Sequence, residues 1–237
     1  MGAAKPRSAE VHPGPGFRVR TDCERVDPEI VAALGRFETP DISDLMNRLY
    51  TMVADIRPQT GPSLQILGTA ITVKTYPGDN LMVHKALDVA KPGDVIVVDT
   101  GGARRTAVLG DLVATKARHR GIAGFVVDGL IRDLPGILEL KDLPVFSRGV
   151  TPVGPLHRGP GEINYPVAVG GIVVQPGDVI VGDLNGVVVV PRESAADLVQ
   201  RLEAHAESSA AYTAAVARGE FSNAWVDTLL RDQGLDF

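Results

Sequence analysis

The stretch VIVVDTGGARRTAVLGDLVATKARHRGIAGFVVDGLIRD (residues 95–133) decides the fold prediction, because it places a helix pattern between two buried-strand patterns. The first apolar run, 95–99, ends at Asp99, and the second, 122–128, ends at Asp128. A glycine-rich loop at 100–110 leads into a helix predicted over 111–120, which Gly121 ends. Strand, helix and strand in this order form a right-handed parallel unit, and parallel sheets bind ligands beyond the carboxyl ends of their strands.

Further elements are predicted on the N-terminal side of this unit. Helices are expected over 28–37 and again from about residue 39, where Thr39 or Asp41 is a candidate N-cap. A strand over 64–76 is followed by a helix over 78–90. The helix side chains expected to face inward are Ile30, Val31, Leu34, Leu45, Met46, Leu49, Leu81, Leu87 and either Val83 or His84.

One phrase occurs twice, as PGDVIVVD at 92–99 and as PGDVIVGD at 176–183. We interpret the copies as two Pro-Gly turns, each followed by a short strand, although a duplicated ligand loop is an alternative. After the second copy, Asn185-Gly186 predicts a hairpin to another strand. Helices are then expected over 192–218, ended by Gly219, and over 222–233, with apolar stripes suited to packing or subunit contacts.

Composition limits the class of protein. Of the 237 residues, 44% are hydrophobic, which supports a sizeable core, and the formal net charge of −5 disfavours nucleic acid as a partner. The single cysteine, Cys23, cannot form an internal disulfide, so we expect a cytoplasmic protein. No apolar window of about 18 residues is available for a membrane span. Residues 1–16, with three prolines, are expected to be a flexible arm.

Acidic and basic side chains meet at the predicted carboxyl edge of the sheet. Asp111 begins a helix, where the amides of Leu112 and Val113 can hold an anion. Arg132 offers a planar fork for a carboxylate, and Asp133 and Asp111 offer oxygen ligands that suit Mg²⁺ or Mn²⁺ better than zinc. This edge therefore predicts a site for a small 2-oxo acid. The alternatives are an N-cap role for Asp111 and a surface ion pair between Arg132 and Asp133.

The run GDLVATKARHRGIAGFVVDGLIRD (110–133) resembles the signature of the RraA-like family, in which an Asp precedes an Arg-Asp pair at fixed spacing. Here Asp111 and Arg132-Asp133 are separated by residues 112–131, and the resemblance continues through 77–99 and 169–191. The family includes class II 4-hydroxy-4-methyl-2-oxoglutarate/4-carboxy-4-hydroxy-2-oxoadipate aldolases and the regulator of ribonuclease E activity. It implies an α/β fold of the swivelling β/β/α type, in homotrimers or homohexamers with sites between subunits.

The resemblance also implies a division of the chain. An N-terminal arm (1–16) would precede a single RraA-like α/β domain (17–191), and a C-terminal helical extension (192–237) would make subunit contacts.

The resemblance also implies residue roles. Asp133 would be a direct ligand of Mg²⁺ or Mn²⁺, and Asp111 would hold a metal-bound water that acts as the base. Arg132 would stabilise the enolate and, with the backbone of Gly110, Leu112 and Val113, hold the pyruvyl part of the substrate. In the aldolases a Glu from the C-terminal helix of a neighbouring subunit completes the metal site. Glu207 is the first candidate for this Glu here, and Glu203 is the second.

One departure from the family pattern and three further positions bear on the site. The aldolases carry a His-Glu pair near where this chain reads DISDLMNR (41–48), so Asp44 is the candidate substitute. Asn80 is expected to line the substrate pocket, whereas His84 is expected to be packed or hydrogen-bonded. Lys116 is expected to point to solvent, which disfavours Schiff-base chemistry.

These features predict a metal-dependent lyase that cleaves 4-hydroxy-2-oxo acids to pyruvate and decarboxylates oxaloacetate through the same enolate. The alternative is a non-catalytic regulator that binds a ribonuclease. The residues after Pro191 favour the enzyme, because the family's regulator lacks the long C-terminal helix. A methyltransferase ranks last, because no G-x-G-x-x-G pattern follows the strand at 95–99.

Overall fold

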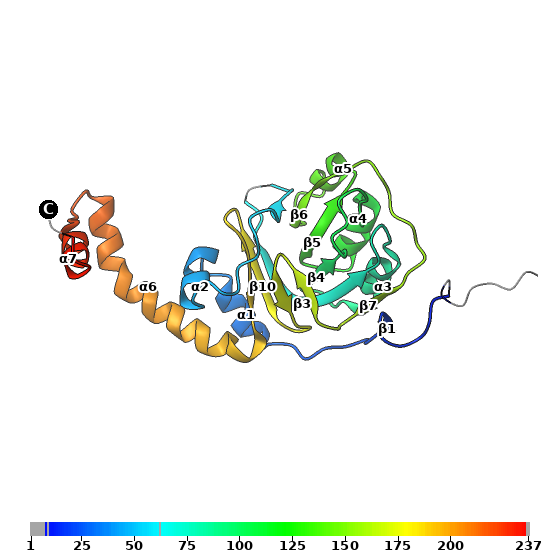
Figure 1. Cartoon of the computed structure of the whole chain (residues 1–237), viewed down its shortest axis with the longest axis horizontal. Helices are drawn as coiled ribbons and strands as arrows, with labels where there is room; N and C mark the ends of the chain where they lie inside the picture. Colours follow the sequence, from blue (N-terminus) through cyan, green and yellow to red (C-terminus); the bar gives the residue numbers. More distant parts are fainter. Residues whose placement is uncertain (1–7, 9, 62, 236–237) are drawn as a thin grey trace, which may run out of the picture. The chain divides into compact units, whose positions relative to one another are not determined.

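The computed structural model describes residue 8 and residues 10–61 and 63–235 (Figure 1). Half of the predicted flexible arm (1–16) therefore lies outside the described residues. The chain divides into two compact units, residues 1–199 and 200–237. The first unit holds the sheet and the helices packed on it, and the second holds most of α6 and all of α7.

The strands are β1 (Phe17–Val19), β2 (Arg57–Pro58), β3 (Ile66–Thr75), β4 (Asp94–Asp99), β5 (Gly124–Ile131), β6 (Val145–Val150), β7 (Gly161–Ile163), β8 (Val167–Val169), β9 (Ile172–Val174), β10 (Val179–Asp183) and β11 (Gly186–Val190). The helices are α1 (Pro28–Leu34), α2 (Thr39–Leu45), α3 (Leu81–Val89), α4 (Asp111–His119), α5 (Leu134–Leu138), α6 (Ala195–Ala217) and α7 (Ala224–Asp232), with a 3₁₀ turn at Arg192–Ser194.

A mixed sheet organises the first unit. Its order is β1-β7-β3-β4-β5-β6-β2, and β3, β4, β5 and β6 run parallel. The predicted strand–helix–strand unit is confirmed as β4, α4 and β5. The predicted hairpin at Asn185-Gly186 is also confirmed, because β10 pairs antiparallel with β11 and then with β3. The fold is the α/β class that the sequence predicts.

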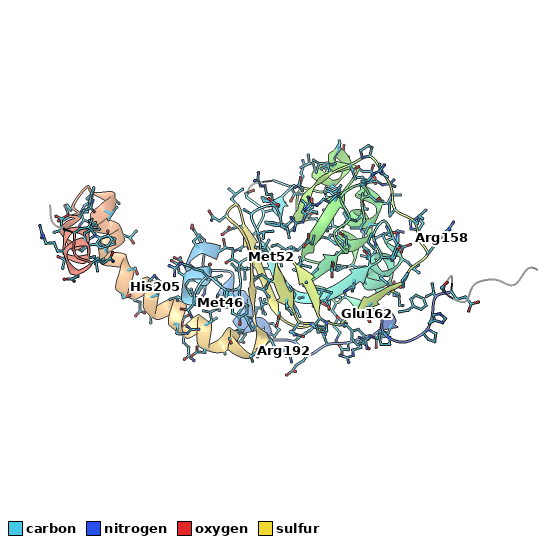
Figure 2. All side chains as sticks on the ribbon, in the orientation of Figure 1. Met46, Met52, Arg158, Glu162, Arg192 and His205 are labelled. Atoms are coloured by element: carbon cyan, nitrogen blue, oxygen red, sulfur yellow. The ribbon has the colours of Figure 1, made fainter. Side chains whose placement is uncertain are left out.

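The continuous apolar runs of the central strands are explained by burial on both faces. In β4, Ile96 and Val98 join a core with residues of α3 and α4, whereas Val95 and Val97 join a second core with β8, β10 and β11. Figure 1 shows α3, α4 and α5 grouped on one side of the sheet. Met52, labelled in Figure 2, belongs to the second core. One face is thus covered by helices and the other by small β hairpins.

Two details of α2 differ from the prediction. Its N-cap is Glu38, while Thr39 is the first helical residue and donates both its amide (2.9 Å) and its hydroxyl (2.7 Å) to the carboxylate of Asp183. Leu49 does not face inward, because α2 ends at Leu45 and the chain then turns through two left-handed residues; the Leu49 side chain is 71% exposed.

The C-terminal helices form as expected. α6 is followed by Gly219, whose φ of 77° is the left-handed conformation that ends a helix at low cost to glycine. Among the described residues, no helix combines the length and apolar character needed to cross a bilayer.

Candidate functional site

A cavity of about 330 Å³ lies where α3 and α4 begin and β5 ends. It is lined by Asn80, His84, Leu109, Gly110, Asp111, Leu112, Val113, Lys116, Arg132, Asp133, Pro155 and His157. Thus Asn80, residues 110–113, Arg132 and Asp133, which the sequence singles out separately, surround one space. Their shared location is the main structural observation about function.

The start of α4 forms one wall of the cavity. Gly110 is the N-cap, in an extended conformation, and Asp111 is the first helical residue, so the N-cap alternative for Asp111 is wrong. Asp111 Oδ1 nevertheless accepts a hydrogen bond from the Leu112 amide at 2.7 Å. That amide therefore already faces a carboxylate, and an anionic ligand has to share or displace this contact. Leu112 itself is 72% exposed, so the helix start is open to solvent.

The Arg132-Asp133 pair forms a second wall. Arg132 Nε lies 3.1 Å from Asp133 Oδ2, with the two side chains 41% and 42% exposed. A pair this exposed contributes little to stability. Asp133 has φ 53° and ψ 37°, a left-handed conformation that is unfavourable for a residue other than glycine. The Arg132 amide donates to the carbonyl of Leu109 at 3.0 Å, which fixes this turn beside the segment that leads into α4.

The side chains of Asp111, Arg132 and Asp133 each pack against a glycine. A Cβ at Gly110 would collide with the Asp133 carboxylate, and one at Gly154 would collide with the guanidinium of Arg132. A Cβ at Gly136 would lie 2.8 Å from both Cβ and Oδ2 of Asp111. The absence of side chains at these positions therefore makes room for the charged groups.

Asn80 and His157 form a hydrogen-bonded pair that also lines the cavity. Asn80 is buried, and its Nδ2 donates to the Val108 carbonyl at 2.8 Å, while its Oδ1 lies 2.6 Å from His157 Nδ1. His157 is not predicted from the sequence, because it lies in a proline- and glycine-rich loop without periodicity. The polar His-Arg dipeptide in that loop was the only sequence signal.

His84 and Lys116 also line the cavity. The rings of His84 and His157 meet edge to face, 5.4 Å between centroids. Burial lowers the pKa of His84, and the charges of His157 and Lys116 lower it further. The expectation that Lys116 points away from the site is wrong, because this exposed lysine lines the cavity. The helical spacing of residues 112 and 116 carries it onto the face that Leu112 also occupies.

The other acidic candidates lie elsewhere. Asp99 accepts the Gly101 amide at 2.8 Å, and Asp128 pairs with Arg148 and accepts the Gly170 amide at 2.7 Å, so both stabilise loops and neither lines the cavity. Asp44 forms an ion pair with Arg48 at 3.0 Å on α2.

Glu207 is exposed on α6, in the second unit. In the described part of the chain, no cluster of three or more His, Cys, Asp or Glu residues is arranged to hold a metal ion.

Comparisons with known proteins show which proteins this chain resembles. The sequence pattern of the RraA-like family, described as Aldolase/RraA, matches residues 39–189. A protein of Halalkalibacterium halodurans named "Putative 4-hydroxy-4-methyl-2-oxoglutarate aldolase" is 43% identical over 163 residues, which cover 69% of this chain and 77% of that protein. A protein of Hahella chejuensis with the same name is 35% identical, over 66% of this chain and 94% of its own length. The crystal structure of Streptomyces coelicolor RraAS2, described as an unusual member of the RNase ES inhibitor RraA family, shares 30% identity with a TM-score of 0.72, over 81% of this chain and 99% of that one.

Proposed function

The chain belongs to the RraA-like family, and from this premise we propose that it is a divalent-metal-dependent lyase that cleaves 4-hydroxy-2-oxo acids to release pyruvate. Decarboxylation of oxaloacetate through the same pyruvate enolate belongs to the proposal. The observation that carries it is the gathering of Asp111, Arg132 and Asp133 around one cavity of small-molecule size. A small 2-oxo acid is the ligand that this combination of charges suits.

The substrate is oriented by its negative end. The guanidinium of Arg132 binds the carboxylate of the pyruvyl part, and the Val113 amide at the start of α4 contributes a further donor. The backbone of Gly110 lies beside the bound ligand, and Asn80 closes the far side. Because negative charge develops on the 2-oxo group when the C3–C4 bond breaks, the same guanidinium stabilises the enolate.

The side chains at the cavity fit a hard divalent cation. Asp133 would hold Mg²⁺ or Mn²⁺ directly, and Asp111 would hold it through water, since carboxylate oxygens are the ligands these ions prefer. The space that Gly110 leaves for the Asp133 carboxylate supports this fit. When bound, the cation acts as a Lewis acid on the 2-oxo group. Two carboxylates are few for such a site, so Glu207 of a neighbouring subunit in a homotrimer or homohexamer is proposed as the third.

Pyruvate release tests this function. The purified protein is given 4-hydroxy-4-methyl-2-oxoglutarate or oxaloacetate, with Mg²⁺ or with a chelator, and pyruvate is followed. We expect metal-dependent release that falls about 100-fold or more in Asp133→Ala and in Arg132→Ala. The matched controls are Asp142→Ala and Arg118→Ala, which break an exposed ion pair on the outer side of α4 (2.6 Å) and should leave turnover unchanged.

A regulator that binds a ribonuclease remains the second candidate, favoured by the likeness to RraAS2. It predicts no turnover of either compound and binding to an endonuclease of the RNase E type. Such binding should survive Asp133→Ala, because the cavity would then have no chemical role.

A further inference from the structure

The loop that carries His157 is held in place on both sides of this residue. The Asn80 amide donates to the Leu156 carbonyl at 3.0 Å, and the Arg158 amide donates to Asp79 Oδ2 at 2.5 Å. Asp79 is buried, so this anchor is shielded from water. Figure 2 labels Arg158 on this loop. His157 therefore lines the cavity while its backbone is held in one position. A residue that reacts with a ligand needs such a fixed geometry.

The hydrogen bonds also determine which ring nitrogen carries the proton. The Val108 carbonyl can only accept, so the Asn80 group facing it at 2.8 Å is Nδ2, and Asn80 Oδ1 is left to face His157. Because that oxygen can only accept, Nδ1 of His157 must be the donor across the 2.6 Å contact. In the neutral imidazole Nε2 then has the free lone pair. Asn80 thus selects the tautomer that exposes a base.

Two side chains that can carry positive charge share the cavity with His157. His84 meets its ring edge to face, and Lys116 lines the same cavity with a positive charge. The pKa of His84 is lowered by burial first, and then by the charges of His157 and Lys116.

We propose that His157 is a catalytic residue, the base that takes the proton from the C4 hydroxyl of a 4-hydroxy-2-oxo acid in this cavity, and that Asn80 is its positioning residue. This inference rests on the proposed lyase function, and it assigns the role of base to His157 in place of the water at Asp111 that the family resemblance implies. Arg132 holds the pyruvyl end of the substrate, and Asn80, His84 and His157 line the same cavity, in which the C4 end of that substrate lies.

The step balances without another reactant. The Nε2 lone pair takes the hydroxyl proton, and the electron pair of that O–H bond becomes the second bond of the new C4 carbonyl. The C3–C4 pair moves to form the C2–C3 double bond, and the π pair of the 2-oxo group moves onto its oxygen. The resulting pyruvate enolate takes one proton at C3, and the imidazolium of His157 gives one up.

Oxaloacetate makes the proposal testable, because it has no C4 hydroxyl. Its decarboxylation gives the same enolate by loss of CO₂, and the enolate then takes a proton from water. The two reactions therefore share Arg132 and the carboxylates, and only aldol cleavage requires His157.

The experiment measures both reactions on the same preparations. Wild type, His157→Gln and His119→Gln are given 4-hydroxy-4-methyl-2-oxoglutarate and, separately, oxaloacetate, each with Mg²⁺, and pyruvate is followed. His119 is exposed in the last turn of α4 and serves as the control. We expect His157→Gln to lower kcat for aldol cleavage by roughly 10²- to 10⁴-fold, the usual contribution of a general base, and to leave decarboxylation within about two-fold.

Two further variants exclude a structural effect. In His157→Ala, added imidazole should restore part of the aldol cleavage and leave decarboxylation unchanged. Asn80→Leu, which removes the tautomer-selecting bond, should lower the ratio of cleavage to decarboxylation in the same direction.

Equal losses in both reactions, or no loss of cleavage in His157→Gln, would overturn the role of His157. A wild type that releases pyruvate from neither compound would reject the proposed function itself, and the inference with it.

Discussion

Asp133 shows how a single residue combines a backbone cost with a position at the cavity. Its left-handed conformation is unfavourable by roughly 1 kcal/mol or more for a residue with a Cβ. Two backbone hydrogen bonds hold the conformation. The amide of the preceding residue, Arg132, donates to the Leu109 carbonyl, and the Asp133 carbonyl accepts the Ile137 amide at 3.2 Å. Strain of this kind occurs often at functional sites, and here it directs a carboxylate toward the cavity.

Gly136 allows a prediction at this scale. It lies within α5, where alanine suits the backbone better than glycine, but a Cβ there would lie 2.8 Å from Cβ of Asp111. We expect Gly136→Ala to displace Asp111 and to lower pyruvate release by roughly 10- to 100-fold, as a small misplacement at a reacting site does. The free energy of unfolding, measured in urea, should change by less than about 1 kcal/mol.

The matched control is Gly61→Ala, because a Cβ at Gly61 meets nothing within 4 Å. Unchanged pyruvate release in Gly136→Ala would show that the position of Asp111 does not matter for turnover.

The site residues that could be predicted from the sequence reach the cavity in a different way from those that could not. Asp111, Arg132 and Asp133 follow strand and helix boundaries that the apolar pattern marks, so their gathering at one edge was predictable. His157 reaches the cavity through hydrogen bonds to residues 79 and 80, which no local pattern encodes. Lys116 was misplaced because an exposed helical position can still line an open cavity.

At the scale of elements, Asp183 joins α2 to the β10–β11 hairpin. Its carboxylate accepts the amide (2.9 Å) and hydroxyl (2.7 Å) of Thr39 and the amide of Asn185 (2.8 Å). Burial alone would raise the pKa of Asp183, but these hydrogen bonds together outweigh it, and the net pKa is lowered from 3.8. The ionised form therefore stabilises the fold above that value, and this contribution is lost as the pH falls through the folded-state pKa.

Asp183→Asn should therefore destabilise the protein. An amide supplies donors where Thr39 also donates, so we expect a loss of about 1–3 kcal/mol in the free energy of unfolding at pH 7. Between about pH 5 and pH 2 the variant should lose less stability than the wild type, because it has no carboxylate to protonate there. Urea unfolding across this pH range is the measurement.

The comparison variant is Asp142→Asn, whose exposed partner is Arg118, and it should leave the free energy of unfolding unchanged. Parallel pH profiles for Asp183→Asn and the wild type would contradict the role of the Asp183 carboxylate.

The elements themselves were predictable where the apolar pattern is long. β3, α3, β4, α4, β5 and the β10–β11 hairpin follow from runs or spacings of apolar residues bounded by turn residues. The three-residue strands β1, β7, β8 and β9 are too short to show a period. The N-cap of α2 was misassigned because the partner of Thr39, Asp183, lies 144 positions away.

At the scale of the whole molecule, the second unit leaves several large apolar side chains exposed. Tyr212 is 63% exposed, Phe221 61% and Trp225 59%, and all three lie between residues 200 and 237. Exposed apolar groups of this size are typical of protein interfaces. They support the proposal that this extension contacts another copy of the chain, from which Glu207 reaches a metal site.

Mixing two inactive variants tests whether each site draws on two subunits. Asp133→Ala removes the direct ligand, and Glu207→Gln removes the proposed ligand on α6, so each homo-oligomer should release little pyruvate. When the two are unfolded, mixed equally and refolded together, a site that takes Asp133 from one chain and Glu207 from its neighbour is intact in roughly one case in four, by random pairing around a closed ring. We therefore expect mixtures to recover about a quarter of the wild-type rate, measured as pyruvate release with Mg²⁺.

A mixture made with Glu203→Gln in place of Glu207→Gln shows which of the two glutamates is the ligand. Only the variant that lacks the true ligand is inactive alone and rescued by mixing. If both variants are inactive and mixing restores nothing, the two residues belong to the same chain's site or Glu207 acts only in folding, and the shared site is rejected.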